Sequence, residues 1–150
     1  MSEGIVRSTP ILGGACHCGK LRIRFSTALP HERFTPRACD CSFCQKHGAA
    51  YISDPGGQLV IEARGPEPVH RYRQGSESAD FLLCRDCGVL VAVVYEEGGT
   101  LYGAVNSGCL DERAQLAPAQ SASPQRLDPE VKRRRWTELW TPGVEITRAG

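Results

Sequence analysis

The stretch that decides the fold is Cys39-Asp40-Cys41-Ser42-Phe43-Cys44, which places three thiols within six residues. Two further cysteine pairs bracket it, Cys16-His17-Cys18-Gly19 upstream and Cys84-Arg85-Asp86-Cys87-Gly88 downstream. The four outer sulfurs are enough for one complete tetrahedral zinc site, whereas the inner three leave the fourth position to another ligand. Because structural zinc sites are closed and catalytic ones keep an open position, the cysteine count predicts two sites of different kinds.

Composition narrows the class of protein. The 150 residues fit one domain with a real core, and 18 Lys and Arg nearly balance 17 Asp and Glu. A binder of nucleic acid or of membrane surfaces would show a marked basic excess, so neither partner is expected. The sequence shows no signal peptide and no apolar run near the roughly 20 residues that a membrane span needs. We therefore expect a soluble, cytoplasmic protein.

Eight cysteines in such a chain need an explanation. Disulfides are disfavoured in a reducing compartment, so thiolate–metal sites are the favoured interpretation. Disulfides and unliganded buried thiols are the alternatives. Thiolates prefer Zn²⁺ to Mg²⁺ or Ca²⁺, so the sequence predicts two bound zinc ions.

Short strands are predicted between the cysteine turns. Lys20–Phe25 alternates strictly between polar and apolar residues, so Leu21, Ile23 and Phe25 should share one buried face. Val89–Tyr95 is apolar throughout and rich in β-branched residues, as in a buried central strand. Further strand-like segments are 58–62, 69–73, 80–83 and 100–106, the last entered through the turn at 96–99. Five or six short strands, with many Gly and Pro, predict a mainly β fold with short helices, organised around zinc-binding cysteine turns.

Two short helices are predicted. Ser42–Ala50 begins with Ser42 as N-cap, and Gln45 three residues later completes a capping box. Asp128 as N-cap and Pro129 at the first helical position begin the second helix.

The domain organisation is simple. Residues 1–12 are expected to form a flexible N-terminal lead-in, and residues 13–150 a single zinc-binding domain. Residues 116–125, rich in Ala, Pro, Gln and Ser, are expected to be an irregular connection. The C-terminal segment 128–140 is expected to pack on the domain.

The basic run Lys132 to Arg135 has three interpretations. A solvated helix end is favoured over nucleic-acid contact because the net charge of the chain is only +1. Between these lies the hypothesis that one of the arginines binds a substrate carboxylate through two hydrogen bonds. Trp136 and Trp140, four residues apart, are interpreted as a packing anchor for the C-terminal segment rather than as a substrate wall.

The outer cysteine pairs have the features of a closed metal site. In each pair a short spacer lets both thiolates converge on one ion, and the following Gly frees the backbone to take a positive φ. Cys16, Cys18, Cys84 and Cys87 are therefore predicted to hold a structural zinc whose binding energy stabilises a small core. The alternatives are two independent redox motifs, or a site in which His17 replaces a sulfur instead of merely lying in the turn.

The inner trio of Cys39, Cys41 and Cys44 presents three sulfurs. Its fourth position can hold water, a substrate thiol or a further side chain, and the candidates for that side chain are His47 and Cys109. Either residue would close the site. An open Zn²⁺ acts as a Lewis acid and holds a bound thiol as thiolate at neutral pH, which suits addition of a thiol to an aldehyde carbon.

The ordered cysteine clusters resemble those of a known family, the glutathione-dependent formaldehyde-activating (GFA, or CENP-V/GFA) domain family. The resemblance runs from about Gly13 to about Asp111. The motifs that carry it are Gly14-Ala15-Cys16-His17-Cys18-Gly19, Cys39-Asp40-Cys41-Ser42-Phe43-Cys44 with Gly48-Ala49, Phe81-Leu82-Leu83-Cys84-Arg85-Asp86-Cys87-Gly88, and Asn106-Ser107-Gly108-Cys109-Leu110-Asp111.

This resemblance implies a mainly β fold of the Mss4-like type, built around two zinc sites. The outer four cysteines correspond to structural zinc ligands, and Cys39, Cys41 and Cys44 to catalytic zinc ligands. The implied activity is a carbon–sulfur lyase reaction run in reverse, which combines glutathione and formaldehyde into S-hydroxymethylglutathione. The segment Lys132 to Trp140 matches no motif for glutathione recognition, so the carboxylates and the γ-glutamyl amine of glutathione have no partner assigned from sequence.

Three functional hypotheses follow. The first is a zinc-dependent carbon–sulfur lyase that adds a small thiol such as glutathione to a small aldehyde, with no catalytic residue assigned beyond the metal ligands. The second is a non-catalytic zinc-binding module in which both ions are structural. The third is a thiol redox sensor built on the inner trio.

Overall fold

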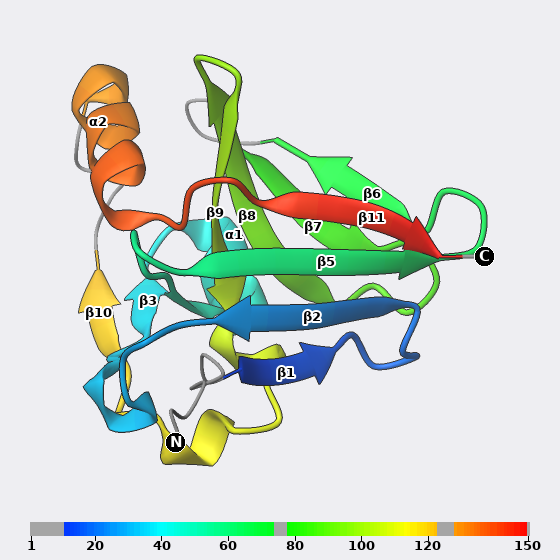
Figure 1. Cartoon of the computed structure of the whole chain (residues 1–150). Coiled ribbons are helices and arrows are strands. Elements are labelled where there is room, and N and C mark those ends of the chain that lie inside the picture. Colours follow the sequence, from blue (N-terminus) through cyan, green and yellow to red (C-terminus); the bar gives the residue numbers. More distant parts are fainter. Residues whose placement is uncertain (1–10, 74–77, 123–127, 150) are drawn as a thin grey trace, which may run out of the picture.

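Two packed β-sheets form the body of the molecule (Figure 1), in a computed structural model that describes residues 11–73, 78–122 and 128–149. The four-stranded sheet has the order β1-β2-β5-β11, and the seven-stranded sheet the order β10-β3-β4-β9-β8-β7-β6. The first contains β1 (Ile11–Ala15), β2 (Leu21–Ser26), β5 (Gln58–Arg64) and β11 (Glu145–Ala149). The second contains β3 (Arg37–Cys39), β4 (Ala50–Ile52), β6 (Val69–Tyr72), β7 (Asp80–Cys84), β8 (Leu90–Glu97), β9 (Thr100–Asn106) and β10 (Gln120–Ala122).

Helices are few and short. They are α1 (Ser42–His47), α2 (Pro129–Leu139) and the 3-10 turns η1 (His31–Arg33), η2 (Ser107–Cys109) and η3 (Arg113–Gln115). No helix in the described ranges is long and apolar enough to cross a membrane. The predicted mainly β class is confirmed, and its form is consistent with an Mss4-like fold.

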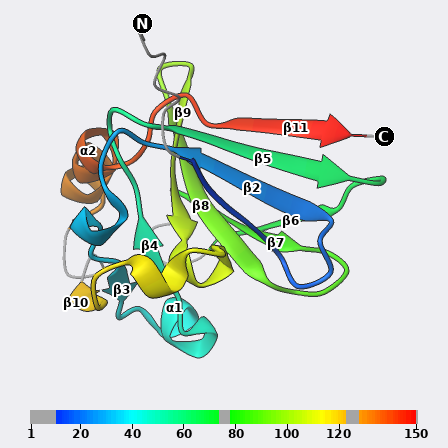
Figure 2. The same cartoon turned by 60° about the horizontal axis from the view of Figure 1, so that its bottom comes forward.

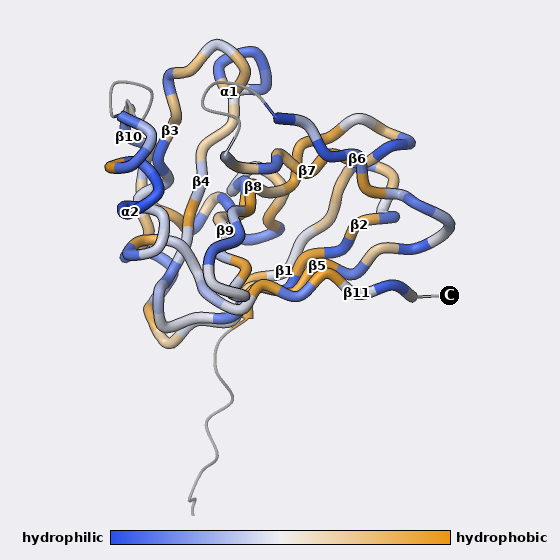
Figure 3. The backbone as a smooth tube through the Cα atoms, turned by 90° about the horizontal axis from the view of Figure 1, so that it is seen from above, coloured by the Kyte–Doolittle hydropathy of each residue, from blue (hydrophilic) through white to orange (hydrophobic). Residues whose placement is uncertain are grey.

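The main core lies between the two sheets. Leu21, Ile23 and Phe25 of β2 are buried, which confirms the face predicted from their alternation. Strand β8 is buried along most of its length because both faces of the seven-stranded sheet are covered there. Figure 2 shows the sheets as two layers, with α1 and α2 outside them, and Figure 3 shows hydrophobic residues gathered in β2, β5 and β8.

The outer face of the seven-stranded sheet carries a second apolar cluster. Cross-strand partners Tyr72, Phe81, Val93 and Ala104 stand on this face, since directly paired residues project to the same side. The cluster also contains Cys41, Cys44, Tyr51 and Trp140. Both α1 and the end of α2 therefore pack on the outer face.

The first helix begins one residue earlier than predicted. Cys41, not Ser42, is the N-cap of α1, and its Sγ accepts a hydrogen bond from the backbone N–H of Cys44 at 3.4 Å. The predicted capping box of Ser42 and Gln45 is therefore wrong, because a thiol has taken the capping position that an oxygen normally fills. The helix ends at His47, earlier than the predicted Ala50, and Gly48 caps it with a φ of 62°, the left-handed conformation that glycine adopts most easily.

The second helix confirms the start predicted for it. Asp128 occupies the N-cap position and Pro129 the first turn, although the Asp128 side chain makes no capping hydrogen bond. The rings of Trp136 and Trp140 stack at 4.9 Å, and Tyr95 of β8 meets Trp136 edge-on at 5.2 Å. Trp140 is buried, so the two tryptophans anchor α2 to the sheet as interpreted.

Several strands lie where none was expected. The described residues form eleven strands instead of five or six. Strand β10 falls inside residues 116–125, which were expected to be irregular, because its backbone pairs in parallel with β3. Strand β11 pairs in parallel with β5. Both β10 and β11 form because they pair with a strand distant in sequence, and not because of a local sequence pattern.

The N-terminal boundary also needs a correction. The lead-in was expected to run to residue 12, but Ile11 and Leu12 belong to β1, whose backbone pairs antiparallel with β2. Leu12 is fully buried in the main core. The rest of that prediction, residues 1–10, lies outside the described residues.

Candidate metal centres

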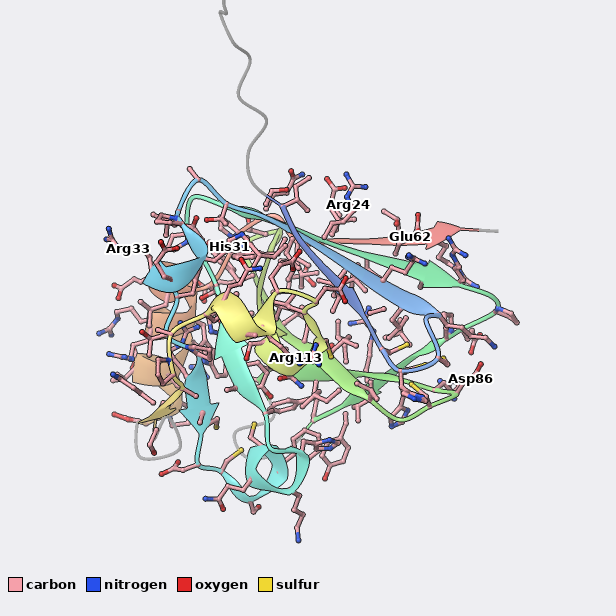
Figure 4. The ribbon with its side chains drawn as sticks, turned by 90° about the horizontal axis from the view of Figure 1, so that it is seen from below. Arg24, His31, Arg33, Glu62, Asp86 and Arg113 are labelled. Carbon is pink, nitrogen blue, oxygen red and sulfur yellow. The ribbon has the colours of Figure 1, made fainter. Side chains whose placement is uncertain are left out.

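The outer four cysteines meet at one place. The Sγ atoms of Cys16, Cys18, Cys84 and Cys87 all lie within 4.8 Å of one another, although Cys18 and Cys84 are 66 positions apart in the chain. All eight cysteines of the chain are free thiols, so no disulfide explains this convergence. In Figure 4 the sulfur atoms form separate groups, one beside α1 and one near the labelled Asp86.

Two similar turns bring these sulfurs together. The N–H of Cys16 donates to the carbonyl of Leu21, and the N–H of Cys84 donates to the carbonyl of Val89, each at 2.9 Å. In both turns the glycine after the second cysteine has a positive φ, 86° at Gly19 and 80° at Gly88. The conformation expected at these two glycines is confirmed.

The outer set links the two sheets. Cys16 directly follows β1 of the four-stranded sheet, and Cys84 is the last residue of β7 in the seven-stranded sheet. Both belong to the main core. An ion held here would join the two layers.

The sulfur spacing fits a tetrahedral zinc site. Two thiolates bound to zinc at about 2.3 Å and a tetrahedral angle stand about 3.8 Å apart. The Sγ atoms of Cys16 and Cys18 are separated by 3.7 Å, and those of Cys18 and Cys84 by 3.5 Å. Both distances are close to that tetrahedral edge and far longer than a disulfide bond.

The pKa values of two of the outer thiols are shifted in opposite directions. Burial raises the pKa of Cys84 to about 12. Burial also acts to raise the pKa of Cys87, but hydrogen bonds from the backbone of Cys18 and Val89 and from neighbouring thiols outweigh it and lower that pKa to about 6. A cluster that ionises one thiol and resists ionising the next is one that a divalent cation would stabilise.

The inner trio is a local cluster. The Sγ atoms of Cys39, Cys41 and Cys44 also lie within 4.8 Å of one another. They come from the end of β3 and the first turn of α1, so no long segment of chain is closed between them. Cys41 and Cys44 are only 7% and 1% exposed, whereas Cys39 is partly exposed. The exposed side of the trio is therefore the side of Cys39.

Hydrogen bonding shifts the pKa values of two thiols of the inner trio in opposite directions. The hydrogen bond from Cys44 lowers the pKa of Cys39 to about 6, and that same bond, together with burial, raises the pKa of Cys44. The hydroxyl of Tyr51 lies 3.2 Å from the Cys44 Sγ, and Tyr51 itself is only 6% exposed. A buried phenol beside this sulfur can donate a hydrogen bond to it when the sulfur is bound to metal as a thiolate.

Aromatic side chains line one side of the trio. Phe43, which lies between Cys41 and Cys44 in sequence, stacks on Tyr72 at 5.0 Å and contacts Phe81 at 4.7 Å. Phe81 is buried and Tyr72 is exposed, so this apolar wall reaches the surface.

Neither proposed fourth ligand joins the inner trio. The ring of His47 packs against Phe43 at 4.7 Å and is not part of the sulfur group. Cys109 lies beside the outer set instead, because η2 is held against β1 through the bridge between Gly14 and Leu110. Its pKa is raised to about 11, first by burial and then by the charges of Cys16 and Cys87. Among the described residues, only three candidate ligands gather at the inner site.

Two residues on the sheet face that carries the trio were missed from sequence. Tyr51 and Arg37 are directly paired across β3 and β4, and Arg37 precedes Cys39 by two residues. Period-two spacing along a strand places Arg37 and Cys39 on one face, which is a signal that the sequence did carry. The pairing with Tyr51 depends on the register of two three-residue strands, which no local pattern indicates.

These features define the class of protein: two packed β-sheets carrying two separate thiolate clusters with metal-site geometry. The family model described as glutathione-dependent formaldehyde-activating enzyme matches residues 11–123. The chain therefore belongs to this family, as its motifs suggested.

One solved structure supports the fold. A crystal structure of a Rhodobacter sphaeroides protein, a structural genomics target, is 26% identical in sequence with a TM-score of 0.55. The similarity covers 72% of this chain and 99% of that one. No curated protein matches the chain.

Proposed function

We propose that the protein is a zinc-dependent carbon–sulfur lyase that catalyses the addition of a small thiol to a small aldehyde. The observation that carries this proposal is the contrast between the clusters, four sulfurs in one and three in the other. Family membership names glutathione and formaldehyde as the first substrates to test.

The two clusters would hold different ions. Cys16, Cys18, Cys84 and Cys87 would form the closed structural site, and the inner trio of Cys39, Cys41 and Cys44 would leave one coordination position for substrate. Zinc bound to the trio would supply Lewis acidity that keeps a substrate thiol deprotonated at neutral pH.

The reaction balances without an oxidant. The thiol sulfur forms a bond to the carbonyl carbon of the aldehyde, the carbon–oxygen double bond becomes single, and the thiol proton ends on that oxygen. With glutathione and formaldehyde the product is S-hydroxymethylglutathione.

The residues around the trio have separate tasks in this proposal. The Tyr51 hydroxyl would donate a hydrogen bond to the Cys44 sulfur once that sulfur binds metal as a thiolate, and the N–H of Cys44 donates to the Cys41 sulfur, so both sulfurs would be fixed in direction. Phe43 and its aromatic neighbours exclude water from one side of the trio.

Exchange spectroscopy tests the proposal. Glutathione and formaldehyde interconvert with their adduct in buffer, and NMR exchange measurements would report the rate with and without the zinc-loaded protein. We expect acceleration with the wild-type protein and none with Cys41→Ser. Exchange at the buffer rate with wild-type protein would remove the proposed reaction.

A second candidate function is a non-catalytic module in which both ions are structural. The observation in its favour is the near-complete burial of Cys41 and Cys44. This alternative predicts an inner metal that accepts no added thiol, because a protein ligand or a tightly held water would keep the fourth position.

A further inference from the structure

The motif Asn106 to Asp111 has no part in the proposed function, yet it contains the 3-10 turn η2, which directly follows β9. The first residue of this turn, Ser107, is buried. Its hydroxyl donates a hydrogen bond to the carbonyl of Ala50 at 2.9 Å, and Ala50 is the residue before Tyr51. Figure 2 shows the turn, in yellow, beside β4. One side-chain hydrogen bond therefore connects η2 to the strand that carries Tyr51.

This hydrogen bond takes the place of a backbone pair. Strand β4 has only three residues, and the pair nearest its start that it forms with β9 is Tyr51 with Asn106. In that register the next partner of Ala50 is Ser107, but β9 has already ended there. The Ser107 side chain thus holds the backbone of β4 at the position where the strand pairing stops.

Tyr51 converts the position of this backbone into a contact at the inner site. Its ring is buried in the same outer-face cluster as Cys44, and its hydroxyl lies 3.2 Å from the Cys44 Sγ. A ring packed in a core has few alternative rotamers. The place of the Tyr51 hydroxyl therefore follows the place of the β4 backbone.

The turn η2 is itself held from two sides. The Asn106 side chain donates to the Leu90 carbonyl at 2.9 Å and accepts from the N–H of Gly108 at 3.3 Å. On the other side the turn lies so close to β1 that a Cβ added at Gly14 would collide with the Cys109 carbonyl. A side chain can position a site precisely only from an element that is fixed in this way.

We propose that Ser107 is a positioning residue of the inner metal site: by fixing the Ala50 carbonyl, its hydroxyl places the Tyr51 hydroxyl against the Cys44 sulfur. The assignment rests on the proposed function in so far as it needs a metal at the trio. Within the described residues Ser107 makes no hydrogen bond to a sulfur of the trio, so its whole effect on the metal passes through β4. Partners of metal ligands tune affinity about tenfold or more, and a residue one step further away should contribute less.

A double-mutant cycle tests the assignment. Competition with a chromophoric chelator measures the zinc affinity of the inner site in the wild-type protein, in Ser107→Ala, in Tyr51→Phe and in the double variant. We expect Ser107→Ala to weaken zinc binding at the inner site about fivefold, the worth of one neutral hydrogen bond. The same change made in Tyr51→Phe should have almost no further effect, because the hydroxyl that Ser107 positions is already gone.

Further variants separate positioning from general packing. Ser107→Thr keeps the hydroxyl and should restore the wild-type zinc affinity. Ser53→Ala is the matched control, because it removes another buried hydroxyl, just beyond β4, that donates to the Leu139 carbonyl at 2.7 Å. It should leave the affinity of the inner site unchanged.

Asn106→Ser carries the test if Ser107→Ala does not fold. It removes the contact with the Leu90 carbonyl, while a serine can still cap η2. It should weaken zinc binding at the inner site less than Ser107→Ala does, and again only while the Tyr51 hydroxyl is present.

The outcomes separate this assignment from the proposed function. An unchanged zinc affinity in Ser107→Ala, or an equal loss with and without the Tyr51 hydroxyl, would overturn the assignment and leave the proposed function standing. If the cycle gives the expected result but the exchange of glutathione and formaldehyde is not accelerated, the proposed function fails and the assignment stands. If the trio binds no zinc, both fail.

Discussion

The two cysteine clusters differ in what they connect. The outer four come from turns on different sheets, and their sulfurs bring together parts of the chain 66 positions apart. The inner three come from one strand end and one helical turn and connect nothing distant. Ligand number and chain separation vary together here, and both support the proposal that the outer site serves stability and the inner site serves chemistry.

The surroundings of the clusters point the same way. Cys16 and Cys84 lie in the main core between the sheets, whereas the inner trio packs on the outer face with Tyr51 and Phe43. An ion bound to the outer set would join the two sheets, because Cys16 and Cys84 come from different sheets. An ion on the outer face can meet a ligand from solvent.

The largest effect is expected from Cys84→Ser. Losing the outer ion releases a crosslink between the sheets, and closing a loop of this length is worth about 4 kcal/mol by the loop-entropy model. Urea unfolding of the zinc-loaded variant should show this loss in the free energy of unfolding.

Cys109→Ser is the matched control for that change. It removes a thiol beside the outer set that donates a hydrogen bond to the Leu90 carbonyl at 3.4 Å, so the expected cost is about 1 kcal/mol. Equal losses from Cys84→Ser and Cys109→Ser would contradict the crosslinking role of the outer set.

Cys41→Ser should separate chemistry from stability. The inner metal should be lost and thiol addition should fall to the buffer rate, while the free energy of unfolding changes by about 1 kcal/mol or less. The stability change is small because serine can still cap α1 and no long loop is released. Metal analysis, NMR exchange and urea unfolding of the same preparation check the three parts. A destabilisation as large as that of Cys84→Ser would break the division of roles.

Tyr51→Phe should weaken the inner site alone. Removing the hydroxyl next to the Cys44 sulfur should lower the affinity of the trio for zinc about tenfold or more, as loss of a hydrogen bond to a ligand commonly does. Competition with a chromophoric chelator measures the weaker and the tighter site separately. Tyr95→Phe, which removes a hydroxyl bonded to Glu97, is the control and should change neither affinity.

The smallest effect is expected at the surface of the outer site. Lys20 pairs with Asp86 across the two cysteine turns, and both side chains are about half exposed. Asp86→Asn should lower Tm slightly at low ionic strength and not at high salt, since salt screens exposed pairs.

The pH dependence of this pair has a defined sign. The hydrogen bond that Lys20 makes to Asp86, and then the charge of Asp86, raise the pKa of Lys20 above 10.5. The contribution of the pair to folding stability is therefore complete at neutral pH and disappears only as pH rises through the raised pKa. A Tm difference between wild type and Asp86→Asn that already vanished near neutral pH would contradict the pairing.

The conformation of each cysteine turn could be predicted from sequence because it is local. Short cysteine spacers followed by glycine determine the turns, and the positive φ at Gly19 and Gly88 follows from the same motif. The buried faces of β2 and β8 were likewise visible in strict alternation and in an unbroken apolar run.

What could not be predicted depends on pairing between distant segments. Strand β11 has no distinctive pattern and exists because β5 offers it a parallel partner. Cys109 could not be placed beside the outer set until the contact between η2 and β1 was known. Arg37 and Tyr51 became neighbours only through the register of β3 and β4. The N-cap of α1 was misassigned because a metal-site thiol took the position of a normal capping oxygen.

Zinc K-edge X-ray absorption, before and after addition of 2-mercaptoethanol, tests the central claim most directly. We expect two zinc ions per chain, one with four sulfur ligands and one with three sulfurs and a lighter atom. Added thiol should raise the average sulfur count to four in the wild-type protein and leave it unchanged in Cys41→Ser. Four sulfurs at both sites before addition, or no change on addition to wild type, would contradict the claim that the inner site is open.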